Sequence, residues 1–301
     1  MARKPHDDAL GGSPADRLLS AAVDIRMSPD AVERSYMARQ LVQCTLPHSD
    51  PGNVPLWTRT NGSLTLTLEP YTDRKTLQHL YPYGSIPRLL LFWLVTEATQ
   101  KKSRHIRLGN SLDAFMREIG LNPRTGGGKR GDAARLHAQM ERLFRSTISF
   151  EDQRLTHKTW VDMRVAPKAM LWWDTSRTQQ DNLWESWVEL GEDFYAAITA
   201  APVPVDMRAL RALKRSPLAL DLYAWLVHTA FTASRKRESR VVPWEGLHGQ
   251  MGAEYGEVRR FKQSALAALK KIALVYPALR LETTPTDLIV HPSTAVISAR
   301  P

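Results

Sequence analysis

One order of predicted elements occurs in both halves of the chain, and it constrains the fold more than any other feature. Each half contains an apolar helix, a basic segment, a short strand, two further helices and closing strands. The tripeptide Trp93-Leu94-Val95 has a counterpart in Trp225-Leu226-Val227. The final helix of each half places apolar side chains at i, i+4, i+7 and i+8: Leu136, Met140, Leu143 and Phe144, then Phe261, Ala265, Ala268 and Leu269.

This order is that of the winged helix, so we predict an α+β fold with two tandem winged-helix domains and a helical N-terminal extension. Because the two halves align only with a gap between the tryptophan and final-helix positions, two unrelated α+β segments remain the alternative.

Proline and glycine residues divide the chain into three parts. Residues 14–42 have helical spacing with a break at Ser28-Pro29, and turn-forming residues follow at Pro47, Pro51, Gly52 and Pro55. Pro202 and Pro204 mark a second boundary. We predict an N-terminal tail and helical extension over residues 1–56, a first winged-helix domain with an extended strand and wing region over 57–200, and a second over 201–301.

The finer pattern predicts individual elements. Leu64, Leu66 and Leu68 alternate with threonines as in a half-buried strand, and a long apolar helix begins near Ile86. Ser111 is the expected N-cap of a helix that Gly120 closes. Further strands are expected from Ile148 onward and at residues 160–165, 170–173, 184–190, 279–281 and 288–290. The wings are expected after Ile148 and after Leu281, with Arg154 and Lys158 as the cations nearest the first wing.

Charge and composition narrow the class of partner. Forty-one Lys and Arg residues against 31 Asp and Glu residues give a net charge of +10, which favours a polyanionic partner such as nucleic acid. The longest apolar run, residues 89–95, is too short to span a bilayer, and the N-terminus has no apolar leader. The single cysteine, Cys44, excludes an intrachain disulfide and a cysteine-cluster zinc site. We therefore expect a cytoplasmic protein with no membrane partner.

The final helix of each half is apolar on one side and basic on the other, as a helix bound in a DNA major groove must be. We expect the side chains nearest each helix N-terminus to reach base edges and the basic segments at 101–107 and 235–240 to contact phosphates. A solvated cationic helix face is the alternative for either helix alone. The predicted DNA-binding residues are Arg124, Lys129, Arg130, Arg135 and Arg142 in the first half, and Arg235, Lys236, Arg237, Arg259, Arg260, Lys262 and Gln263 in the second.

Catalytic motifs are missing from the sequence. The glycine triplet before Lys129 lacks the earlier glycine and the following Ser or Thr of a phosphate-binding loop, because Pro123 and Arg130 occupy those positions. The nine histidines show no His-x-His or His-Glu-x-x-His spacing, so the metal site of a rolling-circle nickase is missing. We expect no enzyme activity, no cofactor and no metal, and we expect Cys44 to be inert.

Two separated stretches resemble the RepA-type plasmid replication initiators. These are residues 81–94 (YPYGSIPRLLLFWL), continuing to 98, and residues 202–226 (PVPVDMRALRALKRSPLALDLYAWL). Residues 108–121 and 135–150 fit the same pattern, and the resemblance covers roughly residues 57–290. It implies a bacterial replication initiator that binds repeated origin sequences (iterons), helps to open the duplex, recruits the host initiator and replicative helicase, and often represses its own promoter.

Other functions remain open at this point. A winged-helix repressor without initiator activity would have the same fold, and a basic protein-interaction module would have the same charge. A homodimer is a further hypothesis, with the first domain and residues 14–42 as the place to look for its interface.

Overall fold

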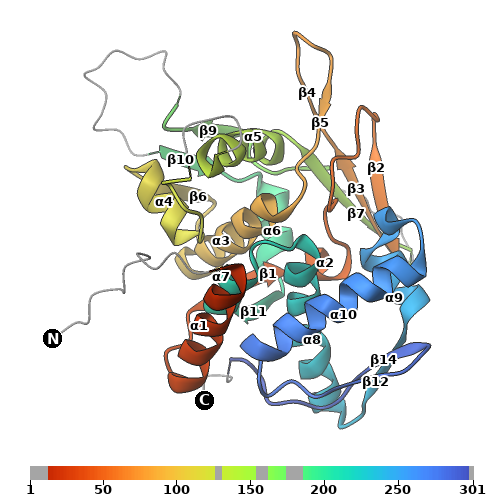
Figure 1. The fold of residues 1–301 in the computed structure, drawn as a ribbon. Helices are drawn as coiled ribbons and strands as arrows, with labels where there is room; N and C mark the ends of the chain where they lie inside the picture. Colours follow the sequence, from red (N-terminus) through yellow and green to blue (C-terminus); the bar gives the residue numbers. More distant parts are fainter. Residues whose placement is uncertain (1–12, 126–130, 154–161, 174–185, 298–301) are drawn as a thin grey trace, which may run out of the picture.

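The computed structural model describes residues 13–125, 131–153, 162–173 and 186–297, which form a mixed α+β fold (Figure 1). The helices are α1 (Pro14–Met27), α2 (Arg39–Gln43), α3 (Ser85–Lys101), α4 (Leu112–Glu118), α5 (Asp132–Phe144), α6 (Glu192–Thr199), α7 (Met207–Leu213), α8 (Pro217–Lys236), α9 (Trp244–Met251), the 3-10 helix η2 (Ala253–Tyr255) and α10 (Val258–Val275). The strands are β1 (Arg34–Ala38), β2 (Trp57–Asn61), β3 (Leu64–Glu69), β4 (Tyr71–Thr72), β5 (His79–Leu80), β6 (His105–Gly109), β7 (Thr147–Asp152), β8 (Asp162–Arg164), β9 (Lys168–Met170), β10 (Ser186–Glu189), β11 (Pro202–Asp206), β12 (Arg240–Pro243), β13 (Leu281–Thr283) and β14 (Asp287–Val290).

Two groups of elements share one topology. The first unit consists of α3, β6, α4, α5, β9 and β10, and the second unit consists of α8, β12, α9, α10, β13 and β14. Each contains an antiparallel three-stranded sheet, in the order β6-β10-β9 and β12-β14-β13. In both sheets the strand that precedes the second helix is an edge strand paired with the last strand of the unit. The recurrence expected from the sequence is therefore present in the connectivity.

The ends of the first helices repeat as well. Both α3 and α8 end at a cationic residue in the left-handed backbone region, Lys102 at φ 50° and Arg237 at φ 56°. This conformation is uncommon for residues other than glycine, and Leu77 is the only other example among the described residues. The predicted N-cap of α4 is confirmed, because the Ser111 side chain accepts from the Ala114 amide. Ser216 caps α8 in the same way, by accepting from the Ala219 amide.

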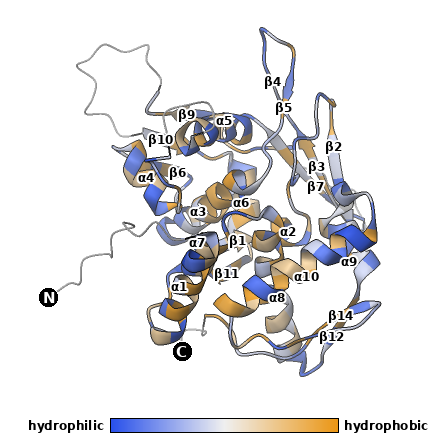
Figure 2. Ribbon diagram, in the orientation of Figure 1, coloured by the Kyte–Doolittle hydropathy of each residue, from blue (hydrophilic) through white to orange (hydrophobic). Residues whose placement is uncertain are grey.

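One continuous hydrophobic core connects the two units. Helices α3 and α8 are buried along nearly their whole length, and they contact each other. Figure 2 shows the hydrophobic character of α3 in the middle of the molecule. The same buried cluster extends from Ile25 on α1 to Val290 on β14. The α1 helix packs against α7 and α10, so the N-terminal extension is part of this core.

The N-terminal extension and the second proline boundary differ from the prediction. Residues 34–38 form strand β1, although the spacing of Val32, Tyr36 and Leu41 suggested a helix. Pro202 and Pro204 lie within β11, which pairs antiparallel with β1 along its whole length. Because this sheet has only two strands, a proline there can turn its missing N–H to the free edge of β11. The segment around Pro202 and Pro204 is therefore an ordered strand.

The strand that follows α5 also differs from the prediction. β7 begins where expected but pairs with β3 and β8 in a four-stranded sheet, β2-β3-β7-β8, and not with β6. The strands that complete the first unit's sheet are β9 and β10, and the wing expected after Ile148 stays a prediction. The predicted wing cations Arg154 and Lys158 lie outside the described residues.

A buried ionic cluster fixes the junction between the two units. Arg88 on α3 donates from Nε and Nη2 to the two carboxylate oxygens of Asp221 on α8, both at 2.8 Å. His48 lies 2.8 Å from the same carboxylate through Nε2, and its neighbour Glu254 pairs with Arg59 at 2.7 Å. Arg88 also donates to the carbonyls of Leu46, Pro47 and Gly84. The cluster therefore joins α3, α8 and the segment before β2.

Candidate nucleic-acid interface

The third helix of each unit carries an exposed arginine at an equivalent position. The alignment of Leu136 with Phe261 places Arg135 opposite Arg260, each one residue before the first core side chain. Their side chains are 57% and 73% exposed. Each lies near a carboxylate three residues earlier, Arg135 at 3.5 Å from Asp132 and Arg260 at 3.7 Å from Glu257. These loose, exposed pairs leave both guanidinium groups accessible to a ligand.

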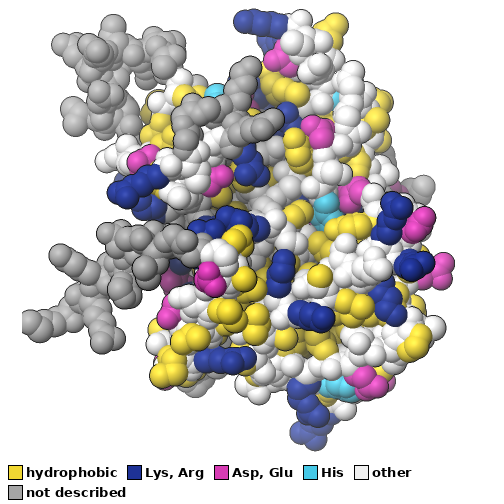
Figure 3. Space-filling view, viewed as in Figure 1, with side chains coloured by type: hydrophobic (Ala, Val, Ile, Leu, Met, Phe, Trp, Pro, Cys, Tyr) yellow, Lys and Arg dark blue, Asp and Glu magenta, His cyan; other side chains and the backbone are white. Residues whose placement is uncertain are grey.

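The α10 helix has a polar stripe opposite its buried face. Its core side is formed by Phe261, Ala265, Ala268, Leu269, Ile272 and Val275. Apart from Ala273, the exposed residues follow helical spacing from its N-terminus: Arg259, Arg260, Gln263, Ala267, Lys270 and Lys271. Figure 3 shows Lys and Arg side chains on this face of the molecule over α10. Cations and one amide along a single exposed helix face suit a polyanionic duplex.

The position of α10 is fixed by contacts at its first turns. Phe261 packs against the rings of His248 and Tyr255, and Gly252 leaves the space that the Phe261 ring occupies. The Lys262 ammonium donates to the carbonyls of Thr284 at 3.1 Å and Pro285 at 2.7 Å and lies over the Trp244 ring. Lys262 therefore joins α10 to the β13–β14 turn and to α9.

The α5 helix is held by contacts on both sides. His137 packs against Trp173, and the Gln139 side chain accepts from the Tyr83 amide. Arg142 is 19% exposed, lies 3.4 Å from Asp50 and donates to the Tyr81 carbonyl. These partners place Arg142 in the contact between α5 and the segment that precedes α3.

The remaining residues that the sequence predicted to bind DNA lie in different parts of the chain. Arg124 is exposed in the loop after α4, whereas Lys129 and Arg130 lie outside the described residues. Arg235 and Lys236 lie in the last turn of α8 and Arg237 is its C-cap, so the first two residues of the expected basic loop at 235–240 are helical. All three side chains are exposed. Figure 1 shows α5 in the upper part of the molecule and α10 in the lower part.

Sequence reasoning missed the residues that orient the two units. Arg88 and Asp221 each stand as a lone charge inside an apolar helix, and that isolation was the available signal. Asp221 is buried; although burial raises its pKa, the Arg88 charge and the hydrogen bonds from His48 and Arg88 lower it to about 2. Burial lowers the pKa of His48 and, with the Arg88 charge nearby, keeps this ring neutral, so its Nε2–H donates to Asp221.

The described residues contain no metal-ligand cluster, and their one cysteine is buried. No group of His, Cys, Asp and Glu side chains within the described ranges could hold a metal ion. Cys44 is buried, and burial raises the pKa of its thiol to about 11. None of the helices in the described part of the chain is long and apolar enough to cross a bilayer.

Comparison with known proteins identifies the family. No curated protein and no solved structure matches the chain. The family model for the plasmid-encoded RepA protein matches residues 81–246, which is more than half of the 301-residue chain and extends from the segment before α3 to α9. The chain therefore belongs to the plasmid-encoded RepA family of replication initiators.

Proposed function

We propose that this protein initiates plasmid replication by binding repeated origin sequences through two winged-helix domains, over residues 57–200 and 201–301. The observation that carries the proposal is the repeated unit with Arg135 and Arg260 exposed at equivalent positions of α5 and α10. The equal strand order of the two three-stranded sheets supports the winged-helix assignment. The β13–β14 turn would be the second wing.

In this proposal α5 and α10 enter successive major-groove segments of one iteron, about 34 Å apart along the duplex. Arg135 and Arg260 would read guanine, and Gln263 would read adenine, because these side chains match the donors and acceptors of those bases. Exposed cations away from the groove, including Arg124, Arg235, Arg237 and Arg259, would contact phosphates or flanking bases. Lys236, which the sequence also predicted to contact a phosphate, lines a separate cleft and would not be required for DNA binding. DNA binding by Lys129 and Arg130 stays a prediction.

Two of the predicted contacts have a different role in the proposal. Lys262 would hold the second wing against α10, since its ammonium already has two carbonyl partners. Arg142 would hold α5 against the preceding segment through Asp50 and Tyr81. Both would act on DNA by positioning a groove-binding helix.

The host partners proposed in addition to DNA rest on the family membership. We propose that the protein helps to open the origin and recruits the host initiator and replicative helicase, as the family membership suggests. A homodimer would use α1, whose Leu19, Val23 and Met27 are 51%, 57% and 78% exposed at helical spacing.

Salt dependence tests the duplex-binding part. With six to ten phosphate contacts, affinity for a duplex carrying the flanking repeats should fall by ~10³ to 10⁵ between 50 and 200 mM salt. A flat salt response in a gel-shift titration would exclude this mode and favour a protein-interaction module.

Alanine variants test whether the two arginines recognise bases. Arg135→Ala and Arg260→Ala should each cost about 1–3 kcal/mol of binding and relax selectivity at one base position. Arg17→Ala, an exposed arginine on α1, is the control and should leave selectivity unchanged. A uniform loss over all sequences would reassign the arginine to a phosphate.

Replication tests the initiator role itself. A plasmid that carries only this gene and its flanking DNA should be maintained, and repeated motifs of ~20 bp should lie in that DNA. Specific binding without maintenance would identify a repressor.

A further inference from the structure

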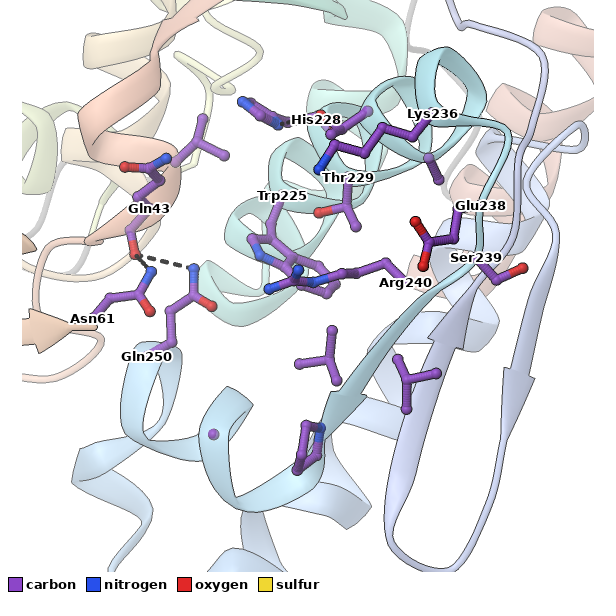
Figure 4. A pocket seen from close by; sticks show the side chains of 17 residues that line it. Gln43, Asn61, Trp225, His228, Thr229, Lys236, Glu238, Ser239, Arg240 and Gln250 are labelled. Atoms are coloured by element: carbon purple, nitrogen blue, oxygen red, sulfur yellow. Dashed lines mark hydrogen bonds between the residues drawn. The ribbon is translucent and has the colours of Figure 1, made fainter. Parts of the chain in front are cut away.

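A polar cleft in the second unit lies apart from the helix assigned to DNA. It has a volume of about 460 Å³, within the range of ligand sites. Its floor is α8, its walls are β12 and α9, and α2 and β2 close the far side (Figure 4). No residue of α10 or of the β13–β14 hairpin lines it. A ligand could therefore occupy the cleft without covering the exposed stripe of α10.

One wall of the cleft is an open strand edge. Among the described residues β12 pairs only with β14 and is an edge strand of its sheet. The Trp244 amide donates to the Thr286 carbonyl, so residues 244, 242 and 240 carry the hydrogen bonds to β14. By alternation the N–H and C=O of Val241 point away from β14. Val241 is also 55% exposed, so its backbone and side chain are both accessible.

The cleft is kept open by a glycine. Gly246 on α9 lines it, and a Cβ atom there would meet no heavy atom within 4 Å. Glycine lowers helix stability relative to alanine, and no close packing at this position requires it. A larger side chain at 246 would instead fill part of the cleft.

The charges in the cleft favour an acidic ligand. Lys236 and Arg240 extend from the end of α8 and from β12 toward Trp225, and Glu238 is the one acidic residue of the lining (Figure 4). Neither cation forms an ion pair with another described residue. Arg235 and Arg237 flank them, so the potential around the cleft is positive.

We propose that this cleft binds an extended acidic peptide segment of a partner protein, which adds a strand to the free edge of β12. The peptide backbone pairs with the N–H and C=O of Val241, as in other strand-addition complexes. One carboxylate side chain of the peptide lies beside Lys236 and Arg240, and an apolar side chain lies on Trp225. The proposal concerns protein recruitment and does not depend on which residues bind DNA.

Fluorescence anisotropy with labelled pentapeptides tests the proposal on the full chain. The probe is acetyl-Glu-Val-Glu-Val-Glu-amide, compared with its Lys-Val-Lys-Val-Lys counterpart and with a form N-methylated at the central glutamate and both valines. Only the unmodified acidic peptide should bind, because N-methylation removes the donors that strand pairing needs. Equal binding of the methylated peptide, or no binding of the acidic peptide up to about 1 mM, would overturn the proposal.

Two variants locate the site, and a third variant is the matched control. Gly246→Leu should weaken peptide binding roughly tenfold or more by filling the cleft, and Val241→Pro should do the same by removing the outward N–H. Gly249→Leu is the control, because it lies on the same helix in equally open space but outside the cleft. Gly246→Leu is expected to fold at least as well as the native chain, since leucine is a better helix former.

Peptide binding that is unchanged in Gly246→Leu, or equally reduced in Gly249→Leu, would contradict the assignment. So would displacement of the peptide by duplex origin DNA, which would place the cleft in the DNA-binding surface. Retained duplex affinity in Gly246→Leu, with lost peptide binding, is the result that the proposal predicts.

Discussion

Arg88 and Asp221 show how single residues determine the relation of the two units. Both are almost fully buried, and their paired hydrogen bonds cross from α3 to α8. Buried charges are costly unless both partners are present. The pair therefore restricts how α3 and α8 can pack more than it stabilises the fold over an apolar alternative.

Removal of one partner should be strongly destabilising. Asp221→Ala leaves Arg88 as an uncompensated buried charge and should lower the free energy of unfolding by about 3–5 kcal/mol, as measured by urea denaturation. Glu141→Gln, which removes an exposed ion pair with Arg145, is the control and should cost under about 1 kcal/mol. A small effect of Asp221→Ala would contradict the structural role of the cluster.

The same cluster predicts how stability depends on pH. The folded pKa of His48 lies below its usual 6.5, so its stabilising contribution is present above that pH and is lost as the pH falls through the folded value. The pKa of Asp221 falls from 3.8 to about 2, so a second loss is expected between about pH 4 and pH 2. Denaturation at a series of pH values should show both losses, and His48→Gln should reduce the first. A first loss that persists unchanged in His48→Gln would assign it to another group, such as His228, whose pKa burial also lowers.

At the scale of elements, local sequence patterns predicted secondary structure best where burial and capping act together. The leucine alternation in β3, the Ser111 cap of α4 and the apolar spacing of α5 and α10 were all confirmed. β1 was missed because its strand character depends on β11, which lies more than 160 residues away in the sequence. The partner of β7 was missed for the same reason, since β3 precedes the whole first unit.

Gly249 in α9 and Gly252 at its C-cap allow a test of this element. Gly249 is exposed in open space, so Gly249→Ala should raise the free energy of unfolding by about 0.5–1 kcal/mol through helix propensity. Gly252→Ala should instead be destabilising, because its Cβ would overlap the Phe261 ring that positions α10. Thermal or urea unfolding measures both, and equal effects of the two substitutions would contradict the described packing.

At the scale of the whole molecule, the sequence predicted the repeat but not its integration. The equivalent strand orders agree with the repeat read from Trp93 and Trp225. The continuous core, the β1–β11 sheet and the Arg88–Asp221 pair connect segments that sequence reasoning had assigned to separate domains. Such contacts follow from tertiary packing and have no local sequence pattern. For the candidate interface, the exposed arginines were predicted, whereas the partners of Lys262 and Arg142 could be found only in three dimensions.

The central claim is that both third helices bind one duplex, and hydroxyl-radical footprinting on the origin repeat tests it most directly. The native protein should protect two segments about one helical turn apart. Arg135→Ala should weaken protection of one segment and Arg260→Ala that of the other, because each arginine belongs to a different unit. A single protected segment, or equal loss of both segments in each variant, would contradict the account.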